Sequence, residues 1–183
     1  MSALLDMKDV ACLRGGRLLF EQFDLTLEKG EAVHVTGANG TGKSSLIRLV
    51  AGLLKPAAGT IERADCALAD ERLALDREAS LDSALGFWIE DTTRRSAGLT
   101  AMGLDLGAVP VRLLSTGQRQ RARLARVIAS DAPLWLLDEP LNGLDRDAAD
   151  RLGRAIAAHR AQGGAVLAAS HVPMAGDWLS VAL

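Results

Sequence analysis

The sequence predicts an α/β protein with a mainly parallel β-sheet, and three segments carry this prediction. Residues 134–137 and 165–169 are apolar at every position, which is typical of strands that are covered on both faces. Residues 145–162, between them, have the length and pattern of a helix. Residues 32–36 are mostly apolar and lead into a glycine-rich stretch. Strands that alternate with helices in this way favour a parallel sheet.

The composition is that of a globular protein of about one domain. The chain has 183 residues, of which 49% are hydrophobic and 24% are charged, and these values exclude a disordered tail protein. Lys and Arg number 21 and Asp and Glu number 23, so the formal net charge is −2. Because positive and negative charges nearly balance, the protein has no net positive charge that would attract a nucleic acid, and this argues against such a partner.

The sequence also predicts a protein that does not enter a membrane. No apolar run approaches the roughly 20 residues that span a bilayer. The first residues include Asp6, Lys8 and Asp9, where a signal peptide would need an apolar stretch. We therefore expect a cytoplasmic protein without direct membrane insertion, whose membrane association would go through a partner.

The cysteines and two of the histidines show no metal-binding pattern. Cys12 and Cys66 form no CxxC pair, so we expect small buried residues in a reducing compartment. His34 lies in an apolar strand and His159 is expected on a polar helix face. His171 is different, because it follows a buried strand directly.

The first third of the chain is predicted to contain short strands. Residues 10–13 and 17–20 flank a Gly-Gly turn at 15–16 and are expected to form a hairpin. Residues 23–27 alternate with period two, as in a half-buried strand. A helix is expected after the glycine-rich stretch and should end at Gly52.

The middle of the chain is predicted to contain two helices. Ser80 is expected to cap a helix that carries Leu81, Leu85 and Trp88, and polar residues 90–96 interrupt this helix. The second helix begins near residue 115 and has one apolar face. Its basic residues are expected to form a solvated face rather than a nucleic-acid patch; they include Arg119, Arg121 and Arg123.

Residues 37–44 match the phosphate-binding pattern G-x-x-x-x-G-K-[ST] at every fixed position, between a strand and a helix. The glycines let backbone N–H groups turn toward phosphate oxygens, and the following helix adds the positive end of its dipole. Lys43 is expected to reach the β- and γ-phosphates, and the Ser44 hydroxyl to ligate Mg²⁺. The predicted nucleotide-binding residues are Gly37, Ala38, Asn39, Gly40, Thr41, Gly42, Lys43, Ser44 and Ser45.

Acidic and imidazole side chains follow two of the predicted strands. Asp138 and Glu139 come directly after residues 134–137, and His171 follows residues 165–169. The carboxyl ends of parallel strands meet at one edge of a sheet, where ligands gather. We expect Asp138 to hold Mg²⁺, Glu139 to act as general base on the attacking water, and His171 to contact the γ-phosphate or position that water.

A further segment has the features of an anion-binding helix start. Ser115 and Gln118 have the spacing of a capping box, which by itself is a structural feature. A capped helix start that contains a glycine also presents free N–H groups to an anion. The segment consists of Leu114, Ser115, Thr116, Gly117 and Gln118.

The order of these motifs resembles the nucleotide-binding domain of ABC transporters, over nearly the whole chain. The resemblance implies a P-loop NTPase (ABC ATPase) fold, with an N-terminal antiparallel β-subdomain and a small helical subdomain at about 72–125. It implies that residues 1–183 form a single ABC-type nucleotide-binding domain. It also implies ATPase activity, with ATP and Mg²⁺ bound.

The same resemblance implies a homodimer of the nucleotide-binding domain. In that family two subunits sandwich two ATP molecules, each between one subunit's P-loop and the signature helix of the other. Carried over to this chain, residues 114–118 would act on the ATP of the partner subunit, with Ser115 and Gly117 at its γ-phosphate. Asp145, which ends the D-loop-like sequence Asn-Gly-Leu-Asp, would couple the two sites.

A finer resemblance is carried by residues 12–20 and 80–88. These segments are similar to the CcmA family, the ATP-binding subunits of the haem exporter of cytochrome c biogenesis. The resemblance implies integral membrane partners, CcmB-like and CcmC-like, at the cytoplasmic face of the bacterial inner membrane. It implies that ATP hydrolysis supports haem delivery through release of a haem-loaded chaperone.

A docking groove for the membrane subunits is one interpretation of an apolar cluster. The alternative is ordinary core packing of the same side chains. The cluster consists of Leu81, Leu85, Phe87 and Trp88.

Three positions depart from the ABC pattern. Arg14 stands where an aromatic ring usually stacks on adenine, Asp70 stands near the place of a glutamine, and Thr116 replaces the first signature glycine. Two alternatives therefore stay open beside the haem exporter. One is a nucleotide-dependent assembly module with slow hydrolysis, and the other is the ATPase of another small ABC transporter.

Overall fold

The structure is a computed structural model that describes residues 3–72 and 74–183, and the chain forms two compact units. The first unit contains the chain up to Leu68, together with Ala132–Glu139 and Ala158–Leu183. The second unit contains Ala69–Asp131 and Pro140–Ala157. In the described part of the chain, no helix is long and apolar enough to cross a membrane.

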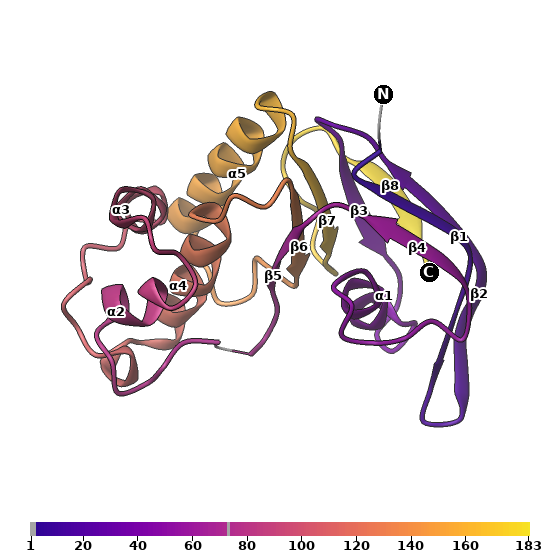
Figure 1. Cartoon of the computed structure of the whole chain (residues 1–183), viewed down its shortest axis with the longest axis horizontal. Helices are drawn as coiled ribbons and strands as arrows, with labels where there is room; N and C mark the ends of the chain where they lie inside the picture. Colours follow the sequence, from indigo (N-terminus) through magenta and orange to yellow (C-terminus); the bar gives the residue numbers. More distant parts are fainter. Residues whose placement is uncertain (1–2, 73) are drawn as a thin grey trace. The chain divides into compact units, whose positions relative to one another are not determined.

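An antiparallel sheet in the first unit contains the N-terminal strands (Figure 1). Its order is β2-β1-β4, formed by β1 (Leu5–Arg14), β2 (Arg17–Leu27) and β4 (Ala58–Arg63). This sheet confirms the expected N-terminal β-subdomain. The prediction of separate strands at 17–20 and 23–27 is wrong, because β2 runs through both. The register with β1 shifts there, and Gln22 takes up the shift with a positive φ of 52°.

The second sheet is the predicted parallel one. Its order is β5-β6-β7-β3-β8, formed by β5 (Cys66–Ala69), β6 (Leu134–Asp138), β7 (Ala165–Ala169), β3 (Ala32–Thr36) and β8 (Leu179–Ala182). β6 and β7, β7 and β3, and β3 and β8 pair in parallel. β7 is buried at all five residues, as expected for a strand covered on both faces.

The core of the first unit is formed by residues of both sheets and of helix α1 (Lys43–Val50). Four apolar residues of α1 are buried against strand residues such as Val33, Val35 and Leu136; they are Leu46, Ile47, Leu49 and Val50. Full burial of one such side chain contributes about 1.5–3 kcal/mol. The P-loop is therefore followed by a helix that is anchored firmly in the core.

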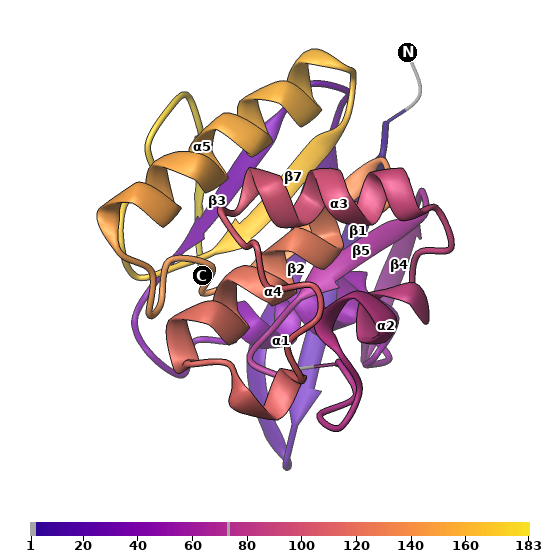
Figure 2. The ribbon, with the colours of Figure 1, turned by 90° about the vertical axis from the view of Figure 1, so that its left-hand side faces the viewer.

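The second unit is mainly helical and contains α2 (Leu81–Gly86), α3 (Thr92–Ala101), the 3₁₀ turn η1 (Val111–Leu113), α4 (Thr116–Ile128) and the start of α5 (Arg146–Ala161). α3 lies against α4 (Figure 2). The two helices come close at Gly98, where a built Cβ would lie only 2.5 Å from the carbonyl oxygen of Ala125. This position therefore requires a glycine.

Two predictions for the middle of the chain are wrong. α2 ends at Gly86, so Trp88 lies beyond the helix that was expected to carry it. The polar stretch 90–96 does not interrupt one helix but contains the start of α3, since the Asp91 carboxylate accepts hydrogen bonds from Thr93 N at 2.8 Å and Arg94 N at 3.2 Å.

Of the basic residues predicted to form a solvated face of α4, Arg123 is in a different environment. Arg123 and Arg126 are partly buried, and burial lowers the pKa of both guanidinium groups. Arg123 donates a hydrogen bond to the carbonyl oxygen of Asp70. The Arg126 guanidinium lies 4.6 Å from the centroid of the Trp88 ring. Both side chains therefore make contacts inside the second unit.

His159 is also not on a polar face. Its ring stacks on Trp135, with centroids 3.9 Å apart and an angle of 9° between the planes. Its Nε2 is 3.2 Å from the carbonyl oxygen of Pro133. Burial lowers the pKa of the His159 imidazole below its usual value. An imidazole can present an apolar face, which the helical pattern alone did not indicate.

Candidate nucleotide-binding site

The predicted phosphate loop connects β3 to α1 in the first unit (Figure 1). Gly42 precedes α1 with a φ of 119°, which only glycine adopts readily. A Cβ at this position would lie 3.1 Å from Phe20 Cδ1 and 3.2 Å from Leu19 Cβ. The loop glycine is therefore required both by its backbone conformation and by the close approach of strand β2.

Lys43 is buried at the centre of this loop. Its Nζ donates hydrogen bonds to the carbonyl oxygens of Gly37 at 2.7 Å and Ala38 at 3.0 Å. Thr41 Oγ1 also donates to the Ala38 oxygen, at 3.1 Å. Residues 37–40 are exposed, so the loop surrounds its lysine and leaves its outer edge accessible. This arrangement suits an anion with several oxygens.

Ser44 and Asp138 meet at the end of β6. Ser44 Oγ donates a hydrogen bond of 2.9 Å to Asp138 Oδ1. A hydroxyl and a carboxylate are the hard oxygen donors that Mg²⁺ takes from proteins, and the ion draws its other ligands from water and phosphate. The donor set therefore fits the predicted magnesium ion.

Glu139 and His171 form a pair at the same edge of the sheet. Glu139 Oε2 lies 2.8 Å from His171 Nδ1, and it also accepts from His171 N at 3.4 Å. Glu139 has a left-handed backbone conformation (φ 48°), and its N–H donates to the carbonyl oxygen of Ala169 at 2.8 Å. With Nδ1 engaged by the carboxylate, the Nε2 of His171 is available to another group.

Two of the remaining predicted residues border the loop. Ser45 is buried in α1, and its Oγ accepts a hydrogen bond of 3.4 Å from Arg14 Nη1 at the end of β1. Asn39 is exposed at the turn of the loop. Arg14 is itself exposed. A cation therefore lies beside the P-loop helix at the position where ABC proteins usually have an aromatic ring.

Asp70 belongs to the second unit and is buried there. Its Oδ1 accepts a hydrogen bond of 3.1 Å from Arg72 N. Its carbonyl oxygen accepts from Arg123 of α4. The residue near the place of the usual glutamine is thus tied to the helix that begins with the signature.

The signature segment starts α4 in the second unit. Ser115 Oγ accepts a hydrogen bond of 3.2 Å from Gln118 N, and Ser115 N donates to Gln118 Oε1 at 2.8 Å. This is the predicted capping box. Leu114 is buried, while Ser115 and Thr116 are exposed. The polar end of the segment therefore faces solvent.

Asp145 lies just before α5 and caps it. Its Oδ1 accepts a hydrogen bond of 2.8 Å from Ala148 N. Gly117 approaches the same segment of chain, because a Cβ built on Gly117 would lie 3.3 Å from the carbonyl oxygen of Gly143. Within the second unit the structure thus brings together the signature start and the 140–145 segment.

The four residues of the apolar cluster proposed for docking fall into a buried pair and an exposed pair. Leu81 and Leu85 are completely buried in the second unit, as the core-packing alternative expected. Phe87 is 83% exposed and Trp88 is 49% exposed, with their rings 5.2 Å apart. An exposed aromatic pair therefore remains as a candidate contact surface.

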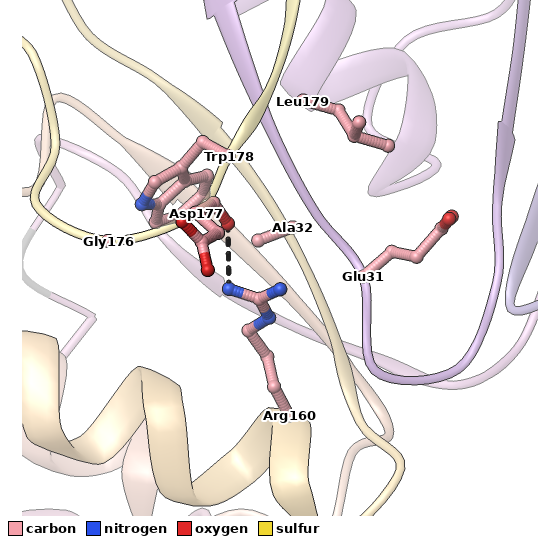
Figure 3. Close-up of a pocket in the computed structure, with 7 residues that line it drawn as sticks. All are labelled: Glu31, Ala32, Arg160, Gly176, Asp177, Trp178 and Leu179. Carbon is pink, nitrogen blue, oxygen red and sulfur yellow. Dashed lines mark hydrogen bonds between the residues drawn. The ribbon is translucent and has the colours of Figure 1, made fainter.

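A cavity of about 420 Å³ lies elsewhere in the first unit (Figure 3). It opens near Ala32, at the start of β3, whereas the P-loop follows the end of that strand. The Arg160 side chain crosses it and donates hydrogen bonds of 2.8 Å to the carbonyl oxygens of Gly30 and Asp177. This cavity is separate from the predicted nucleotide site.

Comparisons with known proteins agree with this geometry. A family model for the ABC transporter matches residues 20–142. The cytochrome c biogenesis ATP-binding export protein CcmA of Novosphingobium aromaticivorans is 59% identical over 169 residues, which cover 91% of this chain and 88% of that protein. The protein of the same name from Sphingopyxis alaskensis is 56% identical over 181 residues, covering 96% and 93%.

The fold is also found among solved structures. An ABC transporter ATP-binding protein from Pyrococcus furiosus superposes with a TM-score of 0.86 at 21% identity, covering 98% of this chain and 96% of that one. Together with the P-loop, these findings define an ATP-binding cassette of the ABC transporter class, which binds nucleotide and hydrolyses ATP. The chain belongs to the CcmA family of cytochrome c biogenesis ATP-binding export proteins.

Proposed function

We propose that this chain is the ATP-hydrolysing subunit of a bacterial inner-membrane complex that exports haem for cytochrome c biogenesis. The single observation that carries the ATPase is the contact of Glu139 with His171 at the sheet edge that carries the P-loop, and the pairing of Ser44 with Asp138 supports it. Family membership supports the cytochrome c pathway. The assignment of haem as the cargo rests on the resemblance to that family.

In the proposed mechanism, the backbone N–H groups of residues 37–45 and the Lys43 ammonium hold the phosphates of ATP. Ser44 and Asp138 would hold Mg²⁺, which when bound neutralises charge on the phosphate oxygens. The Lys43 ammonium exchanges its bonds to Gly37 and Ala38 for bonds to phosphate oxygens.

Glu139 acts as the general base. Its carboxylate takes a proton from a water molecule while the water oxygen attacks the γ-phosphorus. The bond between that phosphorus and the bridging oxygen breaks, its electron pair leaves with ADP, and inorganic phosphate forms. His171 keeps the Glu139 carboxylate in place by donating its Nδ1–H, and the Nε2 of the neutral ring then accepts a hydrogen bond from the attacking water and positions it.

The site is completed by a second copy of the chain. ABC ATP-binding cassettes work as dimers together with membrane subunits. In the proposed homodimer, residues 114–118 of one copy contact the γ-phosphate held by the P-loop of the other, and Asp145 couples the two sites. The exposed Ser115 and its capped helix start support this role. The whole chain, 1–183, then acts as one nucleotide-binding domain with a helical subdomain at about 72–125.

The membrane partners in this proposal are CcmB-like and CcmC-like integral subunits. The chain would sit peripherally at the cytoplasmic face of the inner membrane. The exposed pair Phe87 and Trp88 supports a contact with a membrane subunit, because solvent-facing aromatic pairs are typical of interfaces.

A comparison of the wild-type chain with Glu139→Gln tests the ATPase. We expect the variant to bind ATP normally and to lose at least about 100-fold in kcat, since general-base catalysis is worth roughly 10²–10⁴. The measurement is phosphate release with Mg²⁺, with binding followed by a fluorescent ATP analogue. Equal rates for both proteins would instead favour the alternative, an assembly module with slow hydrolysis, which the departures at Arg14 and Asp70 support.

A further inference from the structure

Gln120 is a buried polar residue that the proposed mechanism does not use. It lies in α4, two residues after the signature segment, and is only 4% exposed. Its Nε2 donates a hydrogen bond of 2.9 Å to the carbonyl oxygen of Pro140. Because a carbonyl oxygen can only accept, this bond fixes which end of the amide faces Pro140.

The segment that receives this bond is held at two further points. A Cβ on Gly117 would lie 3.3 Å from the carbonyl oxygen of Gly143, so α4 and the 140–145 segment touch there as well. At the far end, Asp145 caps α5 through Ala148 N. The exposed residues Ser115 and Asp145 are thus connected by a short chain of contacts, all within the second unit.

The other end of the Gln120 amide has an unfavourable environment. Within residues 3–72 and 74–183, no donor reaches the buried Oε1 atom. A buried acceptor without a partner is destabilising, whereas an apolar side chain of the same size avoids that cost. If Gln120 only filled the core, leucine or methionine would serve better. The useful property of this residue is therefore the bond to Pro140.

We infer that Gln120 is a positioning residue that holds the signature segment (residues 114–118) and the 140–145 segment as one rigid surface. A second copy of the chain then meets Ser115, Gly117 and Asp145 in fixed relative positions. This inference rests on the proposed sandwich dimer and names the residue that makes its contact surface rigid.

The test uses Gln120→Leu and Gln120→Met in the full chain. Each variant is made alone for turnover, and also together with Glu139→Gln so that ATP-bound dimers persist. We expect the melting temperature to change little, because the substitution removes the unpartnered Oε1 atom but leaves the carbonyl oxygen of Pro140 without its donor. We expect ATP affinity of the separate chain to stay within about twofold, and kcat to fall about fivefold, the value of one ordinary hydrogen bond. ATP-dependent dimerisation, measured by light scattering with Mg²⁺, should weaken by the same factor.

The matched control is Gln162→Leu, which changes an exposed glutamine after α5 and should leave turnover and dimerisation unchanged. Gln120→Glu adds a second readout. The charged carboxylate cannot donate to Pro140, but the protonated acid can, so its turnover relative to Gln120→Leu should rise as the pH falls.

Either of two results would overturn the role of Gln120 and leave the proposed function intact. One is wild-type turnover in the leucine and methionine variants, and the other is a loss of turnover that follows a fall in melting temperature. A Ser115→Ala arm separates the inference from the proposed function. If Ser115→Ala weakens the dimer and Gln120→Leu does not, only the role of Gln120 is wrong. If Ser115→Ala has no effect on dimerisation or turnover, the sandwich dimer fails, and the role of Gln120 fails with it.

Discussion

Glu139 shows how one residue can combine strain and chemistry. A left-handed backbone is unusual for a residue with a side chain and costs about 1 kcal/mol or more. The bond from Glu139 N to Ala169 O and the contact with His171 hold it there. Such strained residues cluster at active sites, where the surrounding structure enforces the conformation, although in this chain Gln22 also has a positive φ, at a strand irregularity. The Glu139 carboxylate lies beside His171, just after the carboxyl ends of β6 and β7.

The His159 stack gives the protein an acid-sensitive point. Burial lowers the pKa of His159 below 6.5, so the unfolded chain takes up the proton first as the pH falls. The stabilisation is complete above about 6.5 and is lost progressively between that value and the lower pKa of the folded state. We expect His159→Phe, which keeps a ring against Trp135, to reduce the loss of melting temperature between pH 7.5 and pH 5. An unchanged acid dependence in thermal melts would contradict this.

At the residue scale, the sequence predicts what the backbone dictates and misses what tertiary contacts decide. The P-loop follows from glycine spacing, because only that pattern turns consecutive N–H groups inward. Gln120 was missed because its partner Pro140 is 20 residues away. His159 was misplaced because its stacking partner Trp135 belongs to a different element. No local pattern indicates either contact.

The crossing of α3 and α4 depends on one missing methyl group. A Cβ at Gly98 would lie 2.5 Å from Ala125 O and 2.8 Å from Ala129 Cβ. We expect Gly98→Ala to destabilise the protein by about 1–3 kcal/mol because the helices must move apart. Thermal unfolding should register this as a drop of roughly 2–10 °C.

Gly153 in α5 provides the control for this prediction. A Cβ built there meets nothing within 4 Å, so Gly153→Ala adds helix propensity without a clash. We expect it to stabilise the protein by up to about 1 kcal/mol. The two substitutions should therefore change the melting temperature in opposite directions, and a rise with both would show that the helices are not tightly packed at Gly98.

At the element scale, the strength of the sequence pattern decides what can be predicted. β7 is apolar throughout and β6 is apolar up to Asp138, and both were predicted closely. β4 and β8 were missed, since both are short, largely exposed strands with little apolar pattern. They form through pairing, β4 with β1 and β8 with β3, rather than through their own sequence.

For the whole molecule, the proposed dimer makes a prediction about mixtures. Lys43→Ala removes the P-loop cation, and Ser115→Ala removes a signature hydroxyl. Each variant alone should be nearly inactive, because every site then lacks one part. In a mixed dimer, one site combines an intact P-loop with an intact signature. We expect phosphate release from the mixture to exceed that of either variant alone.

Lys43→Ala mixed with Glu139→Gln is the matched control. Both changes affect the same half of a site, so no mixed dimer contains an intact one. The control mixture should stay as inactive as its components. Recovery in both mixtures, or in neither, would be inconsistent with sites shared between two copies of the chain.

The close contact between strand β2 and the P-loop has a consequence for protein engineering. Leu19 and Phe20 lie against Gly42 so closely that a single added carbon would touch both. Transplanting residues 37–45 into another scaffold would therefore leave this glycine facing a void or a foreign side chain. A graft that carries residues 17–27 along with the loop would keep its shape.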